Sequence, residues 1–197
     1  MNVAILSQKL SDGEDISEYT KSIAMFLNGK GHEVSIVAFE DGSEYSLPEE
    51  IDVERVPLHF EADNLYNWAM MLNNEIKAGV NNLLDGKDVD IIHANDWATV
   101  PGGITLSNYL EIPLVVTVHS TENQRGFGGE NSEMISEMEW KAGFEADKVL
   151  ATNNDTRNSL LFDLDVPEEK IEVIDPFDEG WQHELVGQYS QLVEEKA

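Results

Sequence analysis

Two short apolar runs in the middle of the chain constrain its fold most. Val89–Ile92 and Leu114–Val118 are rich in β-branched side chains, and a histidine follows each run, His93 and His119. Runs of this length are typical of strands buried on both faces of a parallel sheet. Residues 100–110 between them have apolar side chains at helical spacing, which predicts a strand, a crossover helix and a strand. Ligands bind beyond the carboxyl ends of such strands, where we expect both histidines.

The same alternation continues on both sides of this unit. Further strands are predicted over 2–7, 33–39, 52–57, 148–152 and 171–174, and helices over 16–27, 65–84, 134–146, 155–164 and 181–192. Prolines bracket the strand at 52–57, so it is expected at an edge. A glycine-rich loop is expected over 123–130. The pattern predicts an α/β fold: a single Rossmann-like, doubly wound, mostly parallel sheet flanked by helices.

The charge balance is strongly acidic, with 39 acidic against 12 basic residues and a formal charge of −27. This argues against nucleic-acid binding, because phosphate contacts need lysine and arginine. The carboxylates are spread through every segment, so they are expected to coat the folded surface. Salt would screen their repulsion. Adaptation to a high-salt cytoplasm is our hypothesis, and an acidic protein of ordinary cytoplasm is the alternative.

Cysteine is absent, which excludes disulfides and thiolate metal sites. His32, His59 and His183 lack metal-ligand spacing, so we predict no metal and no cofactor. The first residues lack the features of a signal peptide, and no apolar run reaches membrane-spanning length. These features favour a cytoplasmic protein without a membrane span.

Several segments resemble, in the same order, those of one enzyme family. They are 67–73, Ile92-His-Ala-Asn-Asp-Trp97, Val116-Thr-Val-His-Ser-Thr-Glu122 with Arg125 and Gly128-Gly129, 137–140 with 145–147, and 166–174. This pattern resembles glycogen and starch synthases and related GT-B glycosyltransferases of family 4. The resemblance covers 1–174 and implies the N-terminal, acceptor-side domain of an enzyme that moves a hexose from a nucleotide sugar to a glycan.

The resemblance ends after Ile174. The family's Pro-Asn-Gly hinge is replaced by Asp175-Pro-Phe-Asp178, and the family's donor-binding domain has no counterpart in these residues. Residues 180–189 are similar to the family's last helix, which crosses back to the first domain. We therefore expect 175–197 to be a hinge remnant and a C-terminal helix that packs on the same domain.

The first loop also departs from the family. Many members have a Gly-Gly pair there that lets backbone amides approach the donor phosphates. Here only Gly13 stands among Asp12, Glu14 and Asp15. Three carboxylates would repel a phosphate, which argues against donor binding by this half.

His119 and Asp96 are the candidate catalytic residues. The resemblance implies that His119 contacts the transferred sugar, and an imidazole there can donate a hydrogen bond to a hydroxyl or a developing charge. The alternative is a histidine satisfied by neighbouring backbone. Asp96 is similar to a family aspartate near the acceptor and could orient or deprotonate a sugar hydroxyl. Its alternative, compatible with the first, is to cap the helix that begins near Ala98.

The candidate substrate-binding residues are His93, Trp97, Glu122, Arg125 and Gly13. Trp97 could stack on a sugar, although core packing is the commoner role. His93 is expected to support the crevice rather than to do chemistry. Glu122 and Arg125 lie in a loop that could fold over the substrate, with a surface ion pair as the simpler explanation of Arg125. A solvated helix face is expected for the glutamates at 130, 133, 137 and 139.

Three functions remain open at this stage. The first is a glycogen synthase-like acceptor-side domain that is inactive alone. The second is the acceptor subunit of a split glycosyltransferase, and the third is a non-catalytic sugar-binding or scaffold domain. The expected partners are a sugar or glycan acceptor and a nucleotide sugar only together with a donor domain. A separate donor subunit or a homo-oligomer stays open.

Overall fold

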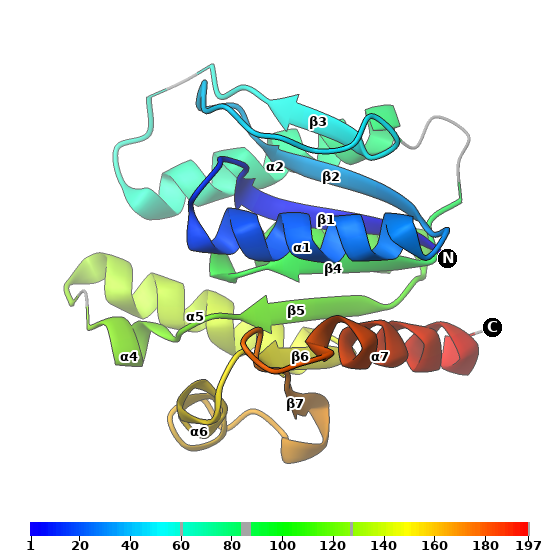
Figure 1. The fold of residues 1–197 in the computed structure, drawn as a ribbon. Helices are drawn as coiled ribbons and strands as arrows, with labels where there is room; N and C mark the ends of the chain where they lie inside the picture. The colour runs from blue at the N-terminus through cyan, green and yellow to red at the C-terminus, as the bar shows by residue number, and fades with distance from the viewer. Residues whose placement is uncertain (60, 84–87, 127, 197) are drawn as a thin grey trace.

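Residues 1–59, 61–83, 88–126 and 128–196 are described by a computed structural model (Figure 1). Within these ranges the strands form one parallel sheet in the order β3-β2-β1-β4-β5-β6-β7. Their bounds are β1 (Asn2–Lys9), β2 (Glu33–Phe39), β3 (Asp52–Val56), β4 (Ile91–Asn95), β5 (Leu114–Val118), β6 (Lys148–Ala151) and β7 (Ile171–Val173). The chain first runs outward from β1 to β3 and then returns to β4. This reversal makes the carboxyl edge near β1 and β4 a switch point of the sheet.

Helices cover both faces of the sheet. They are α1 (Asp15–Gly29), α2 (Leu65–Leu83), η1 (Trp97–Thr99), α3 (Val100–Leu110), α4 (Glu122–Arg125), α5 (Glu130–Glu145), α6 (Asn154–Phe162), η2 (Glu168–Lys170) and α7 (Trp181–Lys196). Helices α1 and α7 pack on one face, and α2 and α5 pack on the other (Figure 1). Side chains of α3 and α6 belong to the same core cluster as those of α2 and α5. The predicted α/β, Rossmann-like fold is confirmed, with every strand pair parallel.

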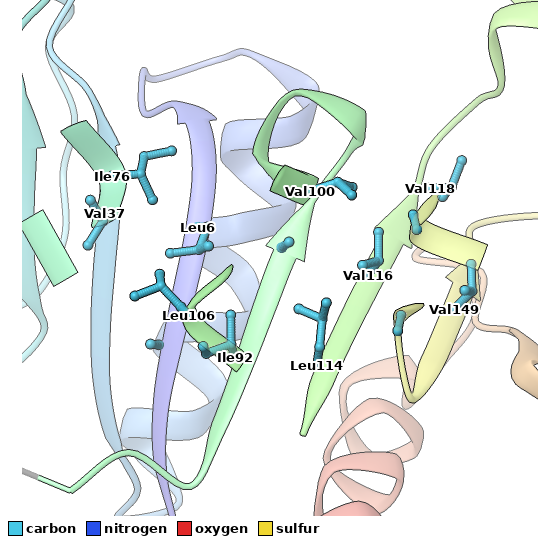
Figure 2. Packing of buried hydrophobic residues seen from close by; sticks show 14 of the residues in the cluster. Leu6, Val37, Ile76, Ile92, Val100, Leu106, Leu114, Val116, Val118 and Val149 are labelled. Carbon is cyan, nitrogen blue, oxygen red and sulfur yellow. The ribbon is translucent and has the colours of Figure 1, made fainter. Parts of the chain in front are cut away.

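Side chains that alternate along each strand build the two cores. Leu6, Ile92 and Leu114 point from neighbouring strands to the α2 and α3 side, where they pack with Ile76 and Leu106 (Figure 2). Full burial of one such side chain contributes about 1.5–3 kcal/mol. The β-branched and aliphatic runs therefore form strands because both of their faces are covered.

Helix α3 lies close to the sheet because of one glycine. A Cβ at Gly103 would lie 3.1 Å from the Ala94 Cβ and 3.1 Å from the Leu114 Cδ1. A side chain there would crowd β4 and β5, and a neighbouring group would have to shift by a few tenths of an ångström. The crossover helix predicted over 100–110 is confirmed with these bounds.

Several predicted boundaries differ from the structure, and two of them lie next to the carboxyl ends of β4 and β5. The strand expected over 89–92 is β4, which begins at Ile91 and continues past His93 to Asn95. The loop expected over 123–130 contains α4 and the start of α5. Thr121 begins α4 with a capping box, in which its side chain and that of Gln124 bond each other's backbone. The predicted helix end at Leu84 lies outside the described residues.

Helix α7 packs on the sheet through one stripe. Trp181, Leu185, Tyr189 and Leu192 are buried, with the α1 side chains and the strand residues Ile5 and Leu150 in the same cluster. The Trp181 ring stacks on the Tyr19 ring with 5.0 Å between the centroids. The connection from β7 to α7 is short, so the start of α7 is fixed next to the carboxyl edge of the sheet.

Candidate functional site

A cavity of about 630 Å³ opens at the carboxyl edge of the sheet. It is lined by the start of α1, by residues just after β5 and β6, and by the segment 175–177 with Trp181. This is the edge at which parallel α/β sheets hold their ligands.

His119 is the strand-end residue that lines this cavity. It follows β5 directly, and its carbonyl accepts hydrogen bonds from the hydroxyls of Thr152 and Thr156, both at 3.2 Å. Its ring meets the Tyr19 ring edge-on at 4.8 Å. Within the described part of the chain, Nε2 is buried and has no hydrogen-bond partner. The backbone carbonyl of this histidine is satisfied, whereas one ring nitrogen is not.

The ionisation of His119 is governed by burial. Burial lowers the pKa of the imidazole, while the carboxylates of Asp96, Glu14 and Asp15 act in the opposite direction. The ring is therefore neutral near pH 7. A neutral imidazole can accept a proton from a sugar hydroxyl or donate a hydrogen bond to it.

Asp96 comes directly after β4 and caps the next turn. Its side chain accepts a hydrogen bond of 2.9 Å from the Trp97 amide at the start of η1, so the capping role is observed. Its backbone has φ 63° and ψ 167°, a region that glycine favours, at a cost of roughly 1–3 kcal/mol for other residues. Burial raises the pKa of the carboxyl group, against the opposing effects of His119 and Arg125.

The expected position of His93 at a strand end is wrong. It lies in the middle of β4, opposite Ile5 and Val115, and is fully buried. Nε2 lies 2.7 Å from the Thr117 hydroxyl and Nδ1 lies 2.5 Å from the Tyr189 hydroxyl. Burial lowers the pKa of His93 to about 3, so the ring is neutral. A polar residue is tolerated inside the strand because both ring nitrogens have partners.

Trp97 and Gly13 also lie outside the cavity lining. Trp97 is 7 % exposed and packs with Ile135 and Met138, which is the core role considered for it. Gly13 has φ +78°, and its amide donates a hydrogen bond of 2.8 Å to Glu18. Because the Gly13 amide already donates to Glu18, it is not directed toward a phosphate.

Arg125 is an interior ion-pair residue, not the surface pair considered above. Its side chain is 16 % exposed, and its Nη2 lies 2.5 Å from the Glu139 carboxylate. Its Nε lies 3.6 Å from Glu122, which is 1 % exposed. Glu122 and Arg125 both lie on α4, next to the segment that carries His119.

The expected solvated face of α5 is wrong at Glu139. Glu139 is 1 % exposed because it shares the inward stripe of α5 with Ile135, Met138 and Ala142. Glu137 is exposed and pairs with Lys141 at 2.8 Å. Glu133 is exposed as well, and the side chain of Glu130 lies outside the described residues.

Several cavity residues were missed by the sequence analysis. Thr152 and Asn153 follow β6, and Asp175, Phe177 and Trp181 lie after β7. The rule that singled out His119, a polar residue directly after a predicted strand, would also have selected Asn153. Trp181 could not be found in this way, because it reaches the cavity only through the return of α7.

In the described ranges, no group of three or more histidine, cysteine, aspartate or glutamate side chains is arranged to hold a metal ion. No helix of the described residues combines the length and the apolar character needed to cross a membrane.

Comparisons with known proteins agree with this architecture. The sequence signature described as Glycosyltransferase Family 4 matches residues 16–177. An uncharacterized glycosyltransferase of Methanocaldococcus jannaschii is 26% identical over an alignment of 173 residues, which covers 85% of this chain and 43% of the relative. Glycogen synthase of Mycobacterium tuberculosis is 28% identical over an alignment of 110 residues, which covers 50% of this chain and 27% of the relative. The chain thus spans less than half the length of these curated relatives.

A similar solved structure is a sucrose-phosphate synthase chain from Thermosynechococcus elongatus. It is 15% identical, has a TM-score of 0.71 and is covered completely, as is this chain. At this identity the likeness concerns the fold alone. The family signature over most of the chain, with the carboxyl-edge cavity on a parallel sheet, shows that the chain belongs to glycosyltransferase family 4, with the fold of the N-terminal domain of GT-B enzymes.

Proposed function

We propose that this chain is the acceptor-side domain of a hexosyltransferase and that its cavity binds the sugar at the end of a glycan. The observation that carries the proposal is the place of His119 in the wall of the carboxyl-edge cavity, with a buried ring Nε2 that has no hydrogen-bond partner in the described part of the chain. A buried polar atom without a partner costs free energy, and a ligand hydroxyl would satisfy it.

The lining of the cavity suits a neutral sugar. Four carboxylates line it, Glu14, Asp15, Glu18 and Asp175, and no lysine or arginine does so among the described residues. Carboxylates accept hydrogen bonds from sugar hydroxyls but repel phosphates. Phe177 and Trp181 add apolar surface on which a sugar ring can pack.

The reaction we propose is transfer of a hexose from a nucleotide sugar to an acceptor hydroxyl. His119 contacts the sugar beside the reacting carbon and stabilises charge that develops there. Asp96, which lies outside the cavity lining but close enough for its charge to act on the pKa of His119, orients the acceptor hydroxyl and takes up its proton. The bond from the anomeric carbon to the donor phosphate breaks, and the bond to the acceptor oxygen forms, with retention as the family resemblance implies.

The nucleotide is bound by a donor domain that the cavity itself does not provide. Six residues, 175–180, separate Ile174 from α7, so a domain is not inserted there. We propose that the donor half comes from outside this segment, as a separate subunit or another part of the protein, and that residues 1–197 alone do not transfer sugar.

Calorimetry in molar KCl tests the sugar site. Titration with maltoheptaose is expected to show binding that His119→Ala weakens about tenfold, equivalent to the loss of about 1.4 kcal/mol. His183→Ala is the matched control, because His183 is exposed and packs edge-on against Phe26 outside the cavity. Absence of binding by the wild type would contradict the acceptor role. Turnover of UDP- or ADP-glucose by the chain alone would contradict the need for a donor domain.

A further inference from the structure

The segment that carries His119 is held from its far side by charged groups in the interior. Residues 119–121 connect β5 to α4, and Thr121 is the N-cap of α4. The Thr121 hydroxyl lies 2.6 Å from the Ser159 hydroxyl of α6. These contacts fix the end of the segment but do not use charge.

Glu139 of α5 supplies the charged contact. Both of its carboxylate oxygens accept hydrogen bonds from the Glu122 amide, at 2.9 Å each. The same carboxylate pairs with Arg125, whose guanidinium also donates to the hydroxyl of Ser120 at 3.1 Å. Ser120 is the residue next to His119. A single carboxylate therefore ties the first turn of α4 to the segment with the candidate catalytic histidine.

Glu139, Arg125 and Glu122, here called the brace, place three charged groups in the interior, which costs more free energy than apolar packing would. Glu122 and Glu139 are each 1 % exposed and both face Arg125. Both oxygens of Glu122 are buried without a hydrogen-bond partner in the described part of the chain. Apolar side chains often replace buried ion pairs without loss of stability, so stability alone does not explain this arrangement.

We propose that Glu139 is a positioning residue: through the Glu122 amide and Arg125 it holds the 119–121 segment so that the His119 ring faces the cavity. This role rests on the proposed function of His119. Glu139 does not line the cavity and does not touch the ligand site.

The protonation of Glu139 can be used to test this positioning role. Burial raises the pKa of Glu139 to about 7, although Arg125 and the Glu122 amide act in the opposite direction. The charged groups that face it are Arg125 and Glu122 from α4 and Asp96 from the end of β4. A proton on Glu139 weakens its bond to Arg125, so the brace loosens as the pH falls through about 7.

Nuclear magnetic resonance of the ¹⁵N-labelled chain tests the coupling. In the wild type, the Glu122 amide is expected to shift with a midpoint near pH 7, and the His119 ring nitrogens are expected to follow the same step. In Glu139→Gln both steps are expected to vanish, and the affinity for maltoheptaose is expected to fall about fivefold. Glu137→Gln is the matched control: it removes the same charge from the same helix, on its exposed face, and is expected to change neither signal nor affinity.

Each outcome decides the proposal. A folded Glu139→Gln protein that keeps the His119 ring signals and an affinity within twofold of wild type would overturn it, as would equal effects of Glu137→Gln. Should Glu139→Gln fail to fold, the wild-type titration still decides: a Glu122 step near pH 7 that His119 does not follow refutes the coupling. If the wild type binds no maltoheptaose, the proposed function fails, and the ring signals still test the role of Glu139.

Discussion

Two histidines, His93 within β4 and His119 directly after the neighbouring β5, show how the partners of a side chain define its role. His93 is buried inside β4, and both of its ring nitrogens contact hydroxyls. His119 follows β5, and its Nε2 has no partner in the described residues. Tyr19 lies between them, with ring centroids 6.5 Å from His93 and 4.8 Å from His119. Both ring nitrogens of His93 are used inside the core, whereas His119 is the histidine that we propose contacts a ligand.

The largest expected difference is in stability. His93→Ala leaves the Tyr189 hydroxyl without its partner inside the core, at roughly 1–3 kcal/mol, and also leaves a cavity, whereas the Thr117 hydroxyl keeps its contact of 3.2 Å with the Tyr19 hydroxyl. Its free energy of unfolding is therefore expected to fall by about 3–5 kcal/mol, and that of His119→Ala by less than about 1 kcal/mol. Urea unfolding at constant KCl measures both values. Equal losses would break the contrast.

The pH dependence of stability should separate the histidines next. The unfolded chain protonates His93 below about pH 6.5, but the folded chain does so only near pH 3, so acid favours unfolding between these values. The contribution is complete above pH 6.5 and falls by up to about 1.4 kcal/mol per unit below it. Unfolding of wild type and His93→Gln between pH 4.5 and 6.5 is the measurement, and the variant is expected to have the shallower slope. His119→Gln, which removes another imidazole whose pKa burial lowers, should also have a shallower slope than the wild type.

A smaller change isolates one hydrogen bond. Tyr189→Phe keeps the ring of Tyr189 but removes the hydroxyl that contacts Nδ1 of His93. It is expected to lower the free energy of unfolding by about 1–3 kcal/mol and to leave maltoheptaose binding unchanged. The reverse pattern is expected for His119→Ala. A loss of sugar affinity in Tyr189→Phe would show that His93 takes part in the site.

Salt is expected to raise the stability of the His93 and His119 variants by the same amount. The formal charge of −27 predicts that the melting temperature rises from low to molar KCl, because the screening length shrinks to roughly 3 Å at 1 M. The difference in stability between the two variants should change by no more than about 0.5 kcal/mol as KCl is added, since neither histidine belongs to the charged surface. Scanning calorimetry checks both points, and a melting temperature independent of salt would refute the high-salt hypothesis.

The fold was predictable because local patterns and global packing agree. The run Leu114–Val118 forms β5 with the predicted bounds, since every one of its side chains is buried. The position of His93 was not predictable from such a run. A histidine next to an apolar segment reads as the end of a strand, and only Thr117 and Tyr189, distant in sequence, allow β4 to continue.

The candidate site was predictable only in part. His119 could be placed because it follows a buried strand, and the capping box at Thr121 and Gln124 was a readable signal for α4. Glu139 looked solvated among other glutamates, and its burial depends on which stripe of α5 faces Arg125. The wall formed by Phe177 and Trp181 depends on the return of α7 to the sheet.

The backbone of Asp96 has one more consequence. Its amide is bound to the Thr117 carbonyl at 2.9 Å, and its carbonyl accepts the Thr99 amide at 3.2 Å, so both ends of a disfavoured conformation are clamped. The direction of the carboxylate is then set during folding and does not have to be selected by a ligand. Asp96→Gly would relieve the backbone strain and also remove the carboxylate. A variant that is more stable but less active would therefore indicate that Asp96 is a preorganised functional group.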